Sequence, residues 1–170
     1  SCANYIFSDL VPINTKENNL SKELIQLVQI FNNQIINFKL PQKDTNSKKI
    51  AICPGASVIW KRWALENFIE VANHLLRLNL IPTFILGPKE KDIERNLQRE
   101  FEKQIKIFST DDPIETIKIA KECRAGISND TGCGHLLAQS GIPIITLFGP
   151  TDHSKFAPLG NQKNVTISSQ

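Results

Sequence analysis

From residue 49 onward, short apolar runs alternate with longer amphipathic stretches, and this alternation restricts the fold more than any other feature of the sequence. The apolar runs predict strands over 50–53, 81–86, 105–108, 125–128 and 142–148. The stretches between them predict helices over 65–78, 89–103, 113–121 and 132–140. Strands that are apolar throughout are typical of a parallel sheet covered on both faces. We therefore predict an α/β fold with a doubly wound, mainly parallel, Rossmann-like sheet.

The beginning of the chain has a different character. Leucine, valine and phenylalanine side chains recur there at helical spacing and predict a helix over 21–32, whereas 42–49 is polar and predicts a linker. We expect a helical or irregular connecting segment over 1–45 and one α/β domain over 46–170. The chain holds no Met and stops just after a strand-like run at 165–167, so we also expect it to be a piece of a longer protein.

Composition excludes several classes of function. The net charge of +3 comes without a dense Lys/Arg run, so nucleic acid is not an expected partner. No apolar run reaches the roughly 18 residues of a membrane span, and the N-terminus lacks the pattern of a signal peptide. The four cysteines show no metal-ligand spacing. We expect reduced thiols in a cytoplasmic protein, with Cys53 buried, and no bound metal.

The predicted topology indicates where on the sheet a ligand would bind. In the strand order 3-2-1-4-5, the first and fourth strands are neighbours at the switch point, and ligands bind beyond their carboxyl ends. The segments that follow these strands are Pro54-Gly55-Ala56-Ser57 and Asn129-Asp130-Thr131-Gly132. Both are rich in small and polar residues, and the second opens a predicted helix. A helix N-terminus favours an anion, so a phosphate or sugar site is expected here.

The first turn and the residues after it each allow two interpretations. Gly55, Ala56 and Ser57 form either a plain strand-to-helix turn or a phosphate-binding turn, and the GxGxxG fingerprint of dinucleotide sites is absent. Lys61 and Arg62 precede a helix, whose dipole opposes nearby cations by a few tenths to about 1 kcal/mol. A diphosphate bound between them would make the interaction of these cations favourable, so we favour anion binding. Trp63 is expected in the core.

The remaining candidates are also open to structural interpretations. Glu90 is an ordinary helix-start residue, or it binds ribose hydroxyls. Asp130 and Thr131 cap the next helix, or Asp130 binds a sugar. His135 is equally consistent with a hydrogen-bonded structural residue and with a catalytic residue. At Thr151 and Asp152 a simple turn is preferred over a reach into the crevice.

Taken together, these motifs resemble glycosyltransferase family 9, the ADP-heptose:lipopolysaccharide heptosyltransferases. The resemblance covers about residues 50–155 and runs through Pro54-Gly55-Ala56-Ser57, Lys61-Arg62-Trp63, Gly87-Pro88-Lys89-Glu90, Asn129-Asp130-Thr131-Gly132-Cys133-Gly134-His135, Gly141-Ile142-Pro143 and Leu147-Phe148-Gly149-Pro150-Thr151-Asp152. It implies the C-terminal half of a GT-B glycosyltransferase, in which two Rossmann-like domains face a cleft and the C-terminal one holds the nucleotide-sugar donor.

The resemblance also implies roles. Ser57 and Lys61 would contact the donor diphosphate, Glu90 the ribose and Asp130 the heptose. The pocket would be completed by Thr131, Gly132 and His135, with Gly55, Ala56, Arg62 and Thr151 as secondary candidates. No cofactor or metal is implied, because cations and helix dipoles stabilise the leaving diphosphate.

The same resemblance places the catalytic base on an N-terminal domain with no counterpart in this chain, so no catalytic residue is assigned and the chain alone is expected to be inactive. The expected partners are an ADP-sugar donor and, through that other domain, a lipopolysaccharide core acceptor. The expected location is the cytoplasm, with peripheral association at the inner membrane. The alternatives are another GT-B enzyme, such as a sugar-nucleotide epimerase or hexosyltransferase, and a non-catalytic nucleotide-sugar-binding module. An NAD-binding domain is disfavoured.

Overall fold

A computed structural model describes residues 46–160 and 164–168, so the predicted segment 1–45 and its helix over 21–32 lie outside the described residues. The described chain forms a six-stranded sheet in the order β3-β2-β1-β4-β5-β6, and every neighbouring pair is parallel. The strands are β1 (Lys49–Cys53), β2 (Ile81–Leu86), β3 (Lys106–Ser109), β4 (Ala125–Asn129), β5 (Ile144–Phe148) and β6 (Asn164–Ser168).

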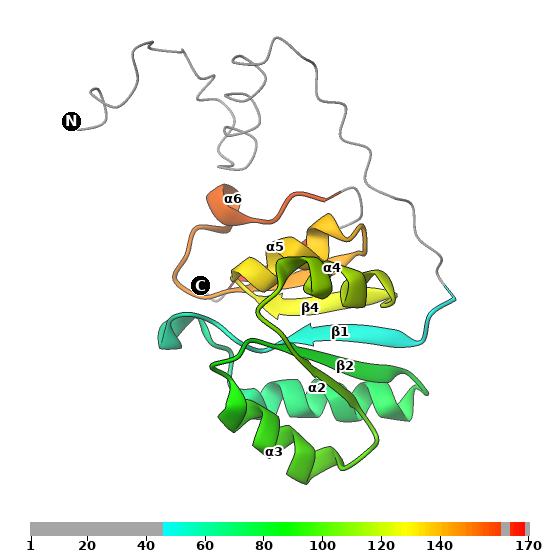
Figure 1. The fold of residues 1–170 in the computed structure, drawn as a ribbon. Coiled ribbons are helices and arrows are strands. Elements are labelled where there is room, and N and C mark those ends of the chain that lie inside the picture. The colour runs from blue at the N-terminus through cyan, green and yellow to red at the C-terminus, as the bar shows by residue number, and fades with distance from the viewer. Residues whose placement is uncertain (1–45, 161–163, 169–170) are drawn as a thin grey trace, which may run out of the picture.

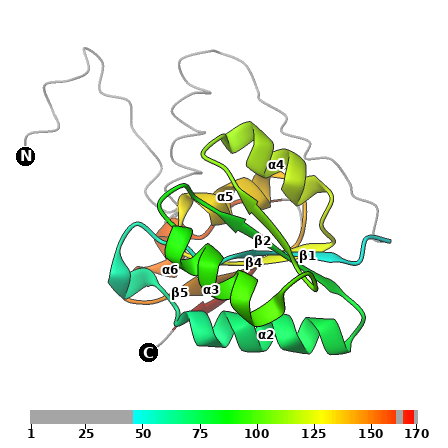
Figure 2. The same cartoon turned by 60° about the horizontal axis from the view of Figure 1, so that its bottom comes forward.

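The helices form a layer on each side of the sheet (Figures 1 and 2). Helices α2 (Leu65–Arg77) and α3 (Lys91–Phe101) cover one face, and α4 (Pro113–Lys121) and α5 (Gly132–Gln139) cover the other. A short 3-10 helix η2 (Ile59–Lys61) precedes α2, and a single turn α6 (His153–Phe156) follows β5. This arrangement confirms the predicted doubly wound fold.

Each face of the sheet has its own hydrophobic core, because successive strand residues point to opposite sides. Ala51 and Cys53 of β1 pack with α4 and α5, whereas Ile52 between them packs with α2 and α3. The large side chains Phe68, Phe84 and Phe101 are fully buried or nearly so in the second core. Both cores thus hold the central strands in one plane, and the strand ends that carry the polar turns are fixed with them.

The predicted elements differ from the structure mainly at their ends. The strand predicted over 142–148 begins at Ile144, because Gly141 takes a φ of 84° that ends α5 and the chain completes a turn before pairing. The helix predicted over 89–103 spans Lys91–Phe101, because Glu90 takes the N-cap position of α3. The strand-like run at 165–167 lies inside β6, which pairs with β5 and extends the predicted order by one strand.

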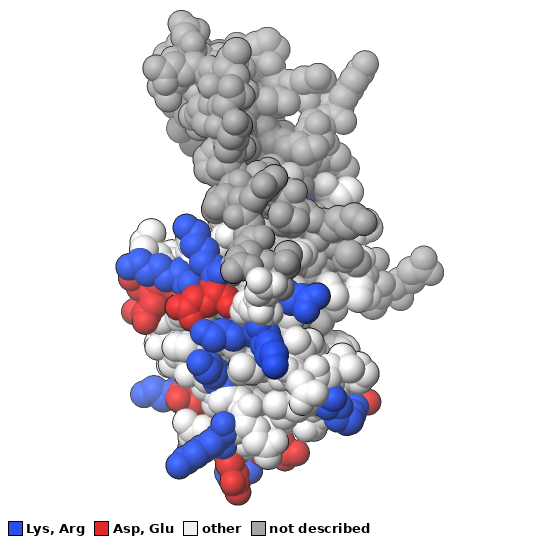
Figure 3. Space-filling model, turned by 90° about the vertical axis from the view of Figure 1, so that its right-hand side faces the viewer, with Lys and Arg blue, Asp and Glu red and all other residues white. Residues whose placement is uncertain are grey.

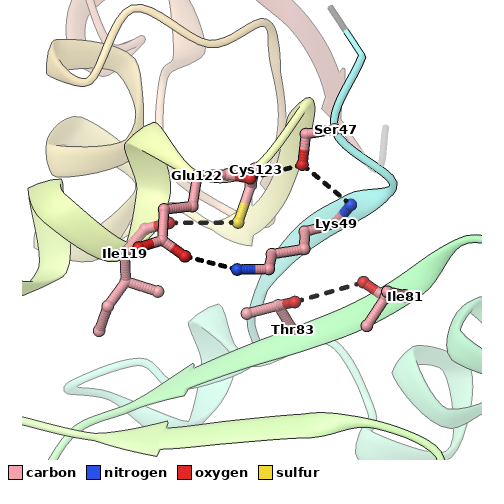
Figure 4. Close-up of polar contacts among 7 residues, drawn as sticks. All are labelled: Ser47, Lys49, Ile81, Thr83, Ile119, Glu122 and Cys123. Carbon is pink, nitrogen blue, oxygen red and sulfur yellow. Dashed lines mark hydrogen bonds and ion pairs between the residues drawn. The ribbon is translucent and has the colours of Figure 1, made fainter.

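The edge of the sheet at which the strands begin is held by polar contacts (Figure 4). Lys49 of β1 forms an ion pair with Glu122, just after α4, and the hydrogen bond that Lys49 donates to this carboxylate raises the pKa of Lys49 above its ordinary value. Ser47 donates to the Glu122 carbonyl and accepts from the Lys49 backbone N–H. Figure 3 views this edge and shows Lys and Arg side chains interspersed with Asp and Glu.

Among the helices of the described ranges, none combines the length and the apolar character that crossing a bilayer requires.

Helix α4 offers a direct test of local stability. Asp112 occupies its N-cap position and accepts a 2.8 Å hydrogen bond from the Ile114 N–H, with Pro113 at the first helical position. We expect Asp112→Ala to lower the free energy of unfolding by about 1 kcal/mol, the usual loss for an N-cap. Urea unfolding measures the change. The neighbouring Asp111, which is also exposed, provides the control: Asp111→Ala should change stability by less than about 0.5 kcal/mol, and equal losses in the two variants would refute the assignment.

Candidate functional site

Two polar turns meet at the edge of the sheet where the strands end. Strands β1 and β4 are neighbours with Cys53 opposite Ser128, so the turn after β1 lies beside the start of α5. A cavity of about 230 Å³ opens between them and extends to the ends of β2 and β3. Among the predicted site residues, its wall includes Gly55, Ala56, Ser57, Glu90 and Thr131. Residues that are far apart in the sequence are thus brought to one crevice at the predicted switch point.

Glu90 lies over the turn that follows β1. Its Oε2 accepts a 2.9 Å hydrogen bond from the Gly87 N–H, so the carboxylate bends back to the end of β2 instead of capping α3. A Cβ atom added to Gly55 would lie 1.5 Å from Glu90 Oε1. A side chain at position 55 would therefore have to displace the Glu90 carboxylate, which occupies that space. Glu90 is held in the cavity wall with one of its oxygens bonded to the backbone.

Lys61 and Asp130 bind each other. Lys61 Nζ lies 2.6 Å from Asp130 Oδ2, and the side chains are 26% and 6% exposed, respectively. A nearly buried carboxylate needs a cation, because an unpaired charge in that position would be costly. An ammonium group has three donors, so this bond leaves Lys61 with capacity for further acceptors. The sequence prediction assigned the two residues to different parts of a ligand, and the structure joins them as one charged pair.

Arg62 and Trp63 have structural contacts beside the cavity. Arg62 Nε donates a 2.9 Å hydrogen bond to the Ala56 carbonyl and so braces the turn after β1. The expectation that Trp63 packs in the core is wrong. Its ring meets buried Phe68 edge-on at 5.1 Å between centroids, but the side chain remains 39% exposed. Because Trp63 precedes α2 rather than belonging to it, its ring covers the end of the core from outside.

Asn129 is a positioning residue that the sequence prediction did not single out. Its side chain is fully buried, and Nδ2 donates a 2.7 Å hydrogen bond to the Pro54 carbonyl. Its Oδ1 accepts a 3.1 Å hydrogen bond from the Trp63 N–H. One amide therefore fixes the turn after β1 and the segment that carries Lys61 relative to the end of β4. The sequence did hold a clue to this role, because a buried Asn at the end of an apolar strand needs hydrogen-bond partners for both its amide N–H and its amide oxygen.

Helix α5 begins without a side-chain cap. Thr131 occupies the N-cap position with extended backbone, but its hydroxyl lies 3.4 Å from the Asn129 carbonyl instead of bonding to the helix. No acidic residue lies in the first turn, and Gly132 is exposed. The expectation that Asp130 or Thr131 caps the helix through its side chain is therefore wrong. The helix start presents N–H groups and a partial positive charge toward the crevice.

Gly134 allows α5 to approach the sheet closely. A Cβ atom at this position would lie 2.5 Å from Ser128 Oγ, whereas a Cβ atom at Gly132 would have no neighbour within 4 Å. Ser128 Oγ is buried and has no hydrogen-bond partner within the described part of the chain. The first turn of α5 is thus set by contact with β4, and its position depends on the absence of a side chain at residue 134.

The other predicted residues do not line this cavity. Gly132 and His135 belong to the first turn of α5, and burial lowers the pKa of His135 below its ordinary value of 6.5, while Asp130 opposes the shift. Thr151 is partly buried in the turn after β5. Asp152 is exposed and caps α6, accepting from the Ser154 N–H at 2.9 Å and from its hydroxyl at 2.7 Å, and the hydroxyl contact is the main cause of its lowered pKa. The preference for a simple turn there agrees with this cap.

The expectation of reduced thiols is contradicted for two cysteines. Cys53 at the end of β1 and Cys133 in α5 form a disulfide with their Cα atoms 6.5 Å apart. They are 80 residues apart in sequence, so only the pairing of β1 with β4 could reveal their proximity. Cys123 is buried and not disulfide-bonded, and its Sγ donates to the Ile119 carbonyl. Within the described ranges, no His, Cys, Asp and Glu side chains gather in a group of three or more that could hold a metal.

The contact between α5 and β4 predicts a double-mutant cycle. Gly134→Ala should lower the free energy of unfolding by about 1–3 kcal/mol, because the new methyl group meets Ser128 Oγ in a packed core. In a Ser128→Ala background the hydroxyl is absent, and most of that loss should disappear. Urea unfolding of the four proteins measures the coupling. Gly132→Ala is the matched control and should cost little; additive effects at positions 128 and 134 would contradict the contact.

The lowered pKa of His135 predicts a dependence of stability on pH. The folded protein binds a proton at this site less readily than the unfolded chain. The stabilisation from neutral His135 is therefore complete above pH 6.5 and is lost as the pH falls through the lower folded-state pKa. We expect His135→Gln to reduce the loss of melting temperature between about pH 7.5 and pH 5. Identical pH profiles of the variant and the parent chain would refute this.

Comparison with known proteins identifies the family. The sequence profile of "Glycosyltransferase family 9 (heptosyltransferase)" matches residues 15–170. Lipooligosaccharide heptosyltransferase 2 of Campylobacter jejuni subsp. jejuni serotype O:2 is 29% identical over 133 residues, which are 75% of this chain and 42% of that protein. The enzyme of the same name from Haemophilus influenzae is 23% identical over 122 residues, which are 68% of this chain and 35% of that protein. The chain thus spans well under half the length of these relatives.

Solved structures share the fold. A glycosyl transferase family 9 protein from Veillonella parvula aligns with a TM-score of 0.76 at 17% identity, covering 94% of this chain and 52% of that one. E. coli heptosyltransferase WaaC with ADP-2-deoxy-2-fluoro heptose aligns with a TM-score of 0.66 at 19% identity, covering 85% of this chain and 49% of that one. The profile match extends over most of the sequence and agrees with the motifs around the crevice. This chain belongs to glycosyltransferase family 9.

Proposed function

We propose that this chain is the donor-binding part of a heptosyltransferase that moves a heptose, or a related sugar, from an ADP-sugar to a lipopolysaccharide core acceptor. The observation that carries the proposal is the uncapped start of α5 next to the Lys61–Asp130 pair, whose Asp130 directly precedes Thr131 of the cavity wall. A helix start and an ammonium group together favour a diphosphate, and a carboxylate within the same site accepts hydrogen bonds from sugar hydroxyls. The names of the related enzymes supply the sugar and the acceptor.

Different residues of the crevice bind different parts of the donor. The diphosphate is bound by the Gly132 N–H, by the hydroxyls of Thr131 and Ser57, and by Lys61. Glu90 accepts from the ribose hydroxyls, since one oxygen is held by the Gly87 N–H and the carboxylate lies in the cavity wall. Asp130 accepts from the heptose. Lys61 lies between the Asp130 carboxylate and the phosphates. Its positive charge is therefore close to the diphosphate as that leaving group gains negative charge.

This arrangement stabilises the leaving group without a metal ion or cofactor. Displacement of the diphosphate by an acceptor hydroxyl then inverts the anomeric carbon, and a general base removes the proton from that hydroxyl. We assign the base to a part of the enzyme outside this chain, so that this chain binds the donor without transferring the sugar. Because the proposed acceptor is joined to a lipid, we further propose that the enzyme associates peripherally with the cytoplasmic face of the inner membrane.

Calorimetry with ADP tests the donor site. We expect saturable binding to the chain and a loss of about 10–100-fold in affinity for Lys61→Ala, because a charge-assisted hydrogen bond contributes roughly 1.5–3 kcal/mol. The affinity of the parent chain should be the same in EDTA and in Mg²⁺. Thermal unfolding of Lys61→Ala accompanies the titration, since Asp130 loses its partner.

Control experiments distinguish the proposed donor site from the alternative functions. Lys121→Ala removes an exposed cation at the end of α4 and should leave the ADP affinity unchanged. Binding of UDP in place of ADP would refute the heptosyl assignment and favour another GT-B enzyme. Sugar transfer by this chain alone would overturn the assignment of the base to another part of the protein.

A further inference from the structure

The disulfide between Cys53 and Cys133 lies in the wall of the cavity that is proposed to take the donor. Both residues line that cavity, together with Gly55, Ser57 and Thr131. Cys53 ends β1 directly before the phosphate-binding turn, and Cys133 follows Gly132 in the uncapped first turn of α5. The bond therefore joins the two backbone segments that supply the proposed diphosphate contacts, and it joins them at the base of the site.

We propose that Cys53 and Cys133 form a reversible thiol modification site that couples the oxidation state of the protein to occupancy of the donor pocket. The coupling half of this inference rests on the proposed function, whereas the existence of the site rests only on the geometry of the two cysteines. In the oxidised state the turn after β1 and the start of α5 are covalently linked. In the reduced state they are held by strand pairing and by the Asn129 hydrogen bonds.

The reaction is a thiol–disulfide exchange with a small-molecule disulfide as the oxidant. One cysteine thiolate attacks a sulfur of the oxidant, forms a mixed disulfide and releases one thiol. The second cysteine thiolate attacks the protein sulfur of that mixed disulfide, forms the Cys53–Cys133 bond and releases a second thiol. The protein loses two protons and two electrons, and the oxidant gains them. A dithiol reductant reverses both steps.

Accessibility favours Cys133 as the first sulfur to react. Cys133 is only partly buried and borders the cavity, whereas Cys53 is 1% exposed at the end of a central strand. Cys123 is a natural control, since it is fully buried just after the end of α4 and its Sγ donates to the Ile119 carbonyl. A ligand in the cavity would cover Cys133 and slow both its oxidation and its alkylation.

The sign of the coupling follows from the position of the bond. Holding both walls at one spacing preorganises the N–H groups that face the diphosphate, so the oxidised protein should bind ADP more tightly. Because coupling is reciprocal, ADP must stabilise the disulfide against reduction by the same factor. We expect a factor of about five, which corresponds to a shift of about 20 mV in the reduction potential of this two-electron couple.

Thiol titration and intact mass test the site itself. A Cys2→Ser/Cys123→Ala background leaves only the pair in question. After equilibration with glutathione disulfide it should lose both reactive thiols and the mass of two hydrogen atoms. Adding Cys53→Ser should instead give a stable adduct of Cys133 with one glutathione, whereas adding Cys133→Ser should give little or no adduct, because Cys53 is buried. Oxidation should also raise the melting temperature by about 10 °C, because the bond closes a long loop. Two free thiols, or separate glutathione adducts on both cysteines, would overturn the site.

Calorimetry of the same background in its oxidised and reduced forms tests the coupling. Tighter binding of ADP to the oxidised form, with an equal shift in the glutathione equilibrium when ADP is present, supports the proposal. Equal affinities, or tighter binding to the reduced form, would overturn the coupling. Failure of ADP to bind either form would refute the proposed function and the coupling together, while the thiol titration still decides whether the redox site exists.

Discussion

The parallel pairing of β1 with β4 is the constraint on which the rest of the structure depends. It crosses from the first half of the fold to the second, and it sets Cys53 opposite Ser128 at the strand ends. The contacts that join the turn after β1 to the end of β4 and the start of α5 follow from it. Asn129, the last residue of β4, extends the contact past the paired residues Cys53 and Ser128, because its side-chain amide bonds to the Pro54 carbonyl and to the Trp63 N–H. The backbone around the cavity is therefore fixed by hydrogen bonds before any ligand is present.

The charged groups of the candidate site neutralise one another in the absence of a ligand, and the start of α5 can still attract an anion. Asp130 is nearly buried and is balanced by Lys61, so neither charge is stranded when the crevice is empty. The open start of α5 adds a partial positive charge that no acidic side chain in its first turn neutralises. An anion entering here meets donors that are already oriented, which reduces the reorganisation needed for binding.

Much of the fold and part of the site were predictable from local patterns. The strand order 3-2-1-4-5 followed from apolar runs and right-handed crossovers, and the structure confirms it. Turn residues such as Gly55 and Ser57 were recognisable because small and polar residues follow apolar strands. The pairing of Lys61 with Asp130, the role of Asn129, the exposure of Trp63 and the disulfide were not. Each depends on which segments become neighbours and on how far a side chain reaches, and neither is encoded in local periodicity.

The class of fold, the edge of the sheet with the candidate site and the resemblance to the family could all be predicted from the sequence, because hydrophobic periodicity and motifs can be recognised without knowing the three-dimensional structure. Which of the candidate residues contact one another became visible only in the tertiary structure. Lys61 and Asp130 are 69 positions apart and Cys53 and Cys133 are 80 apart, yet each pair is in contact. Such contacts form only when strand pairing brings distant segments of the chain together, so they cannot be read from local sequence patterns.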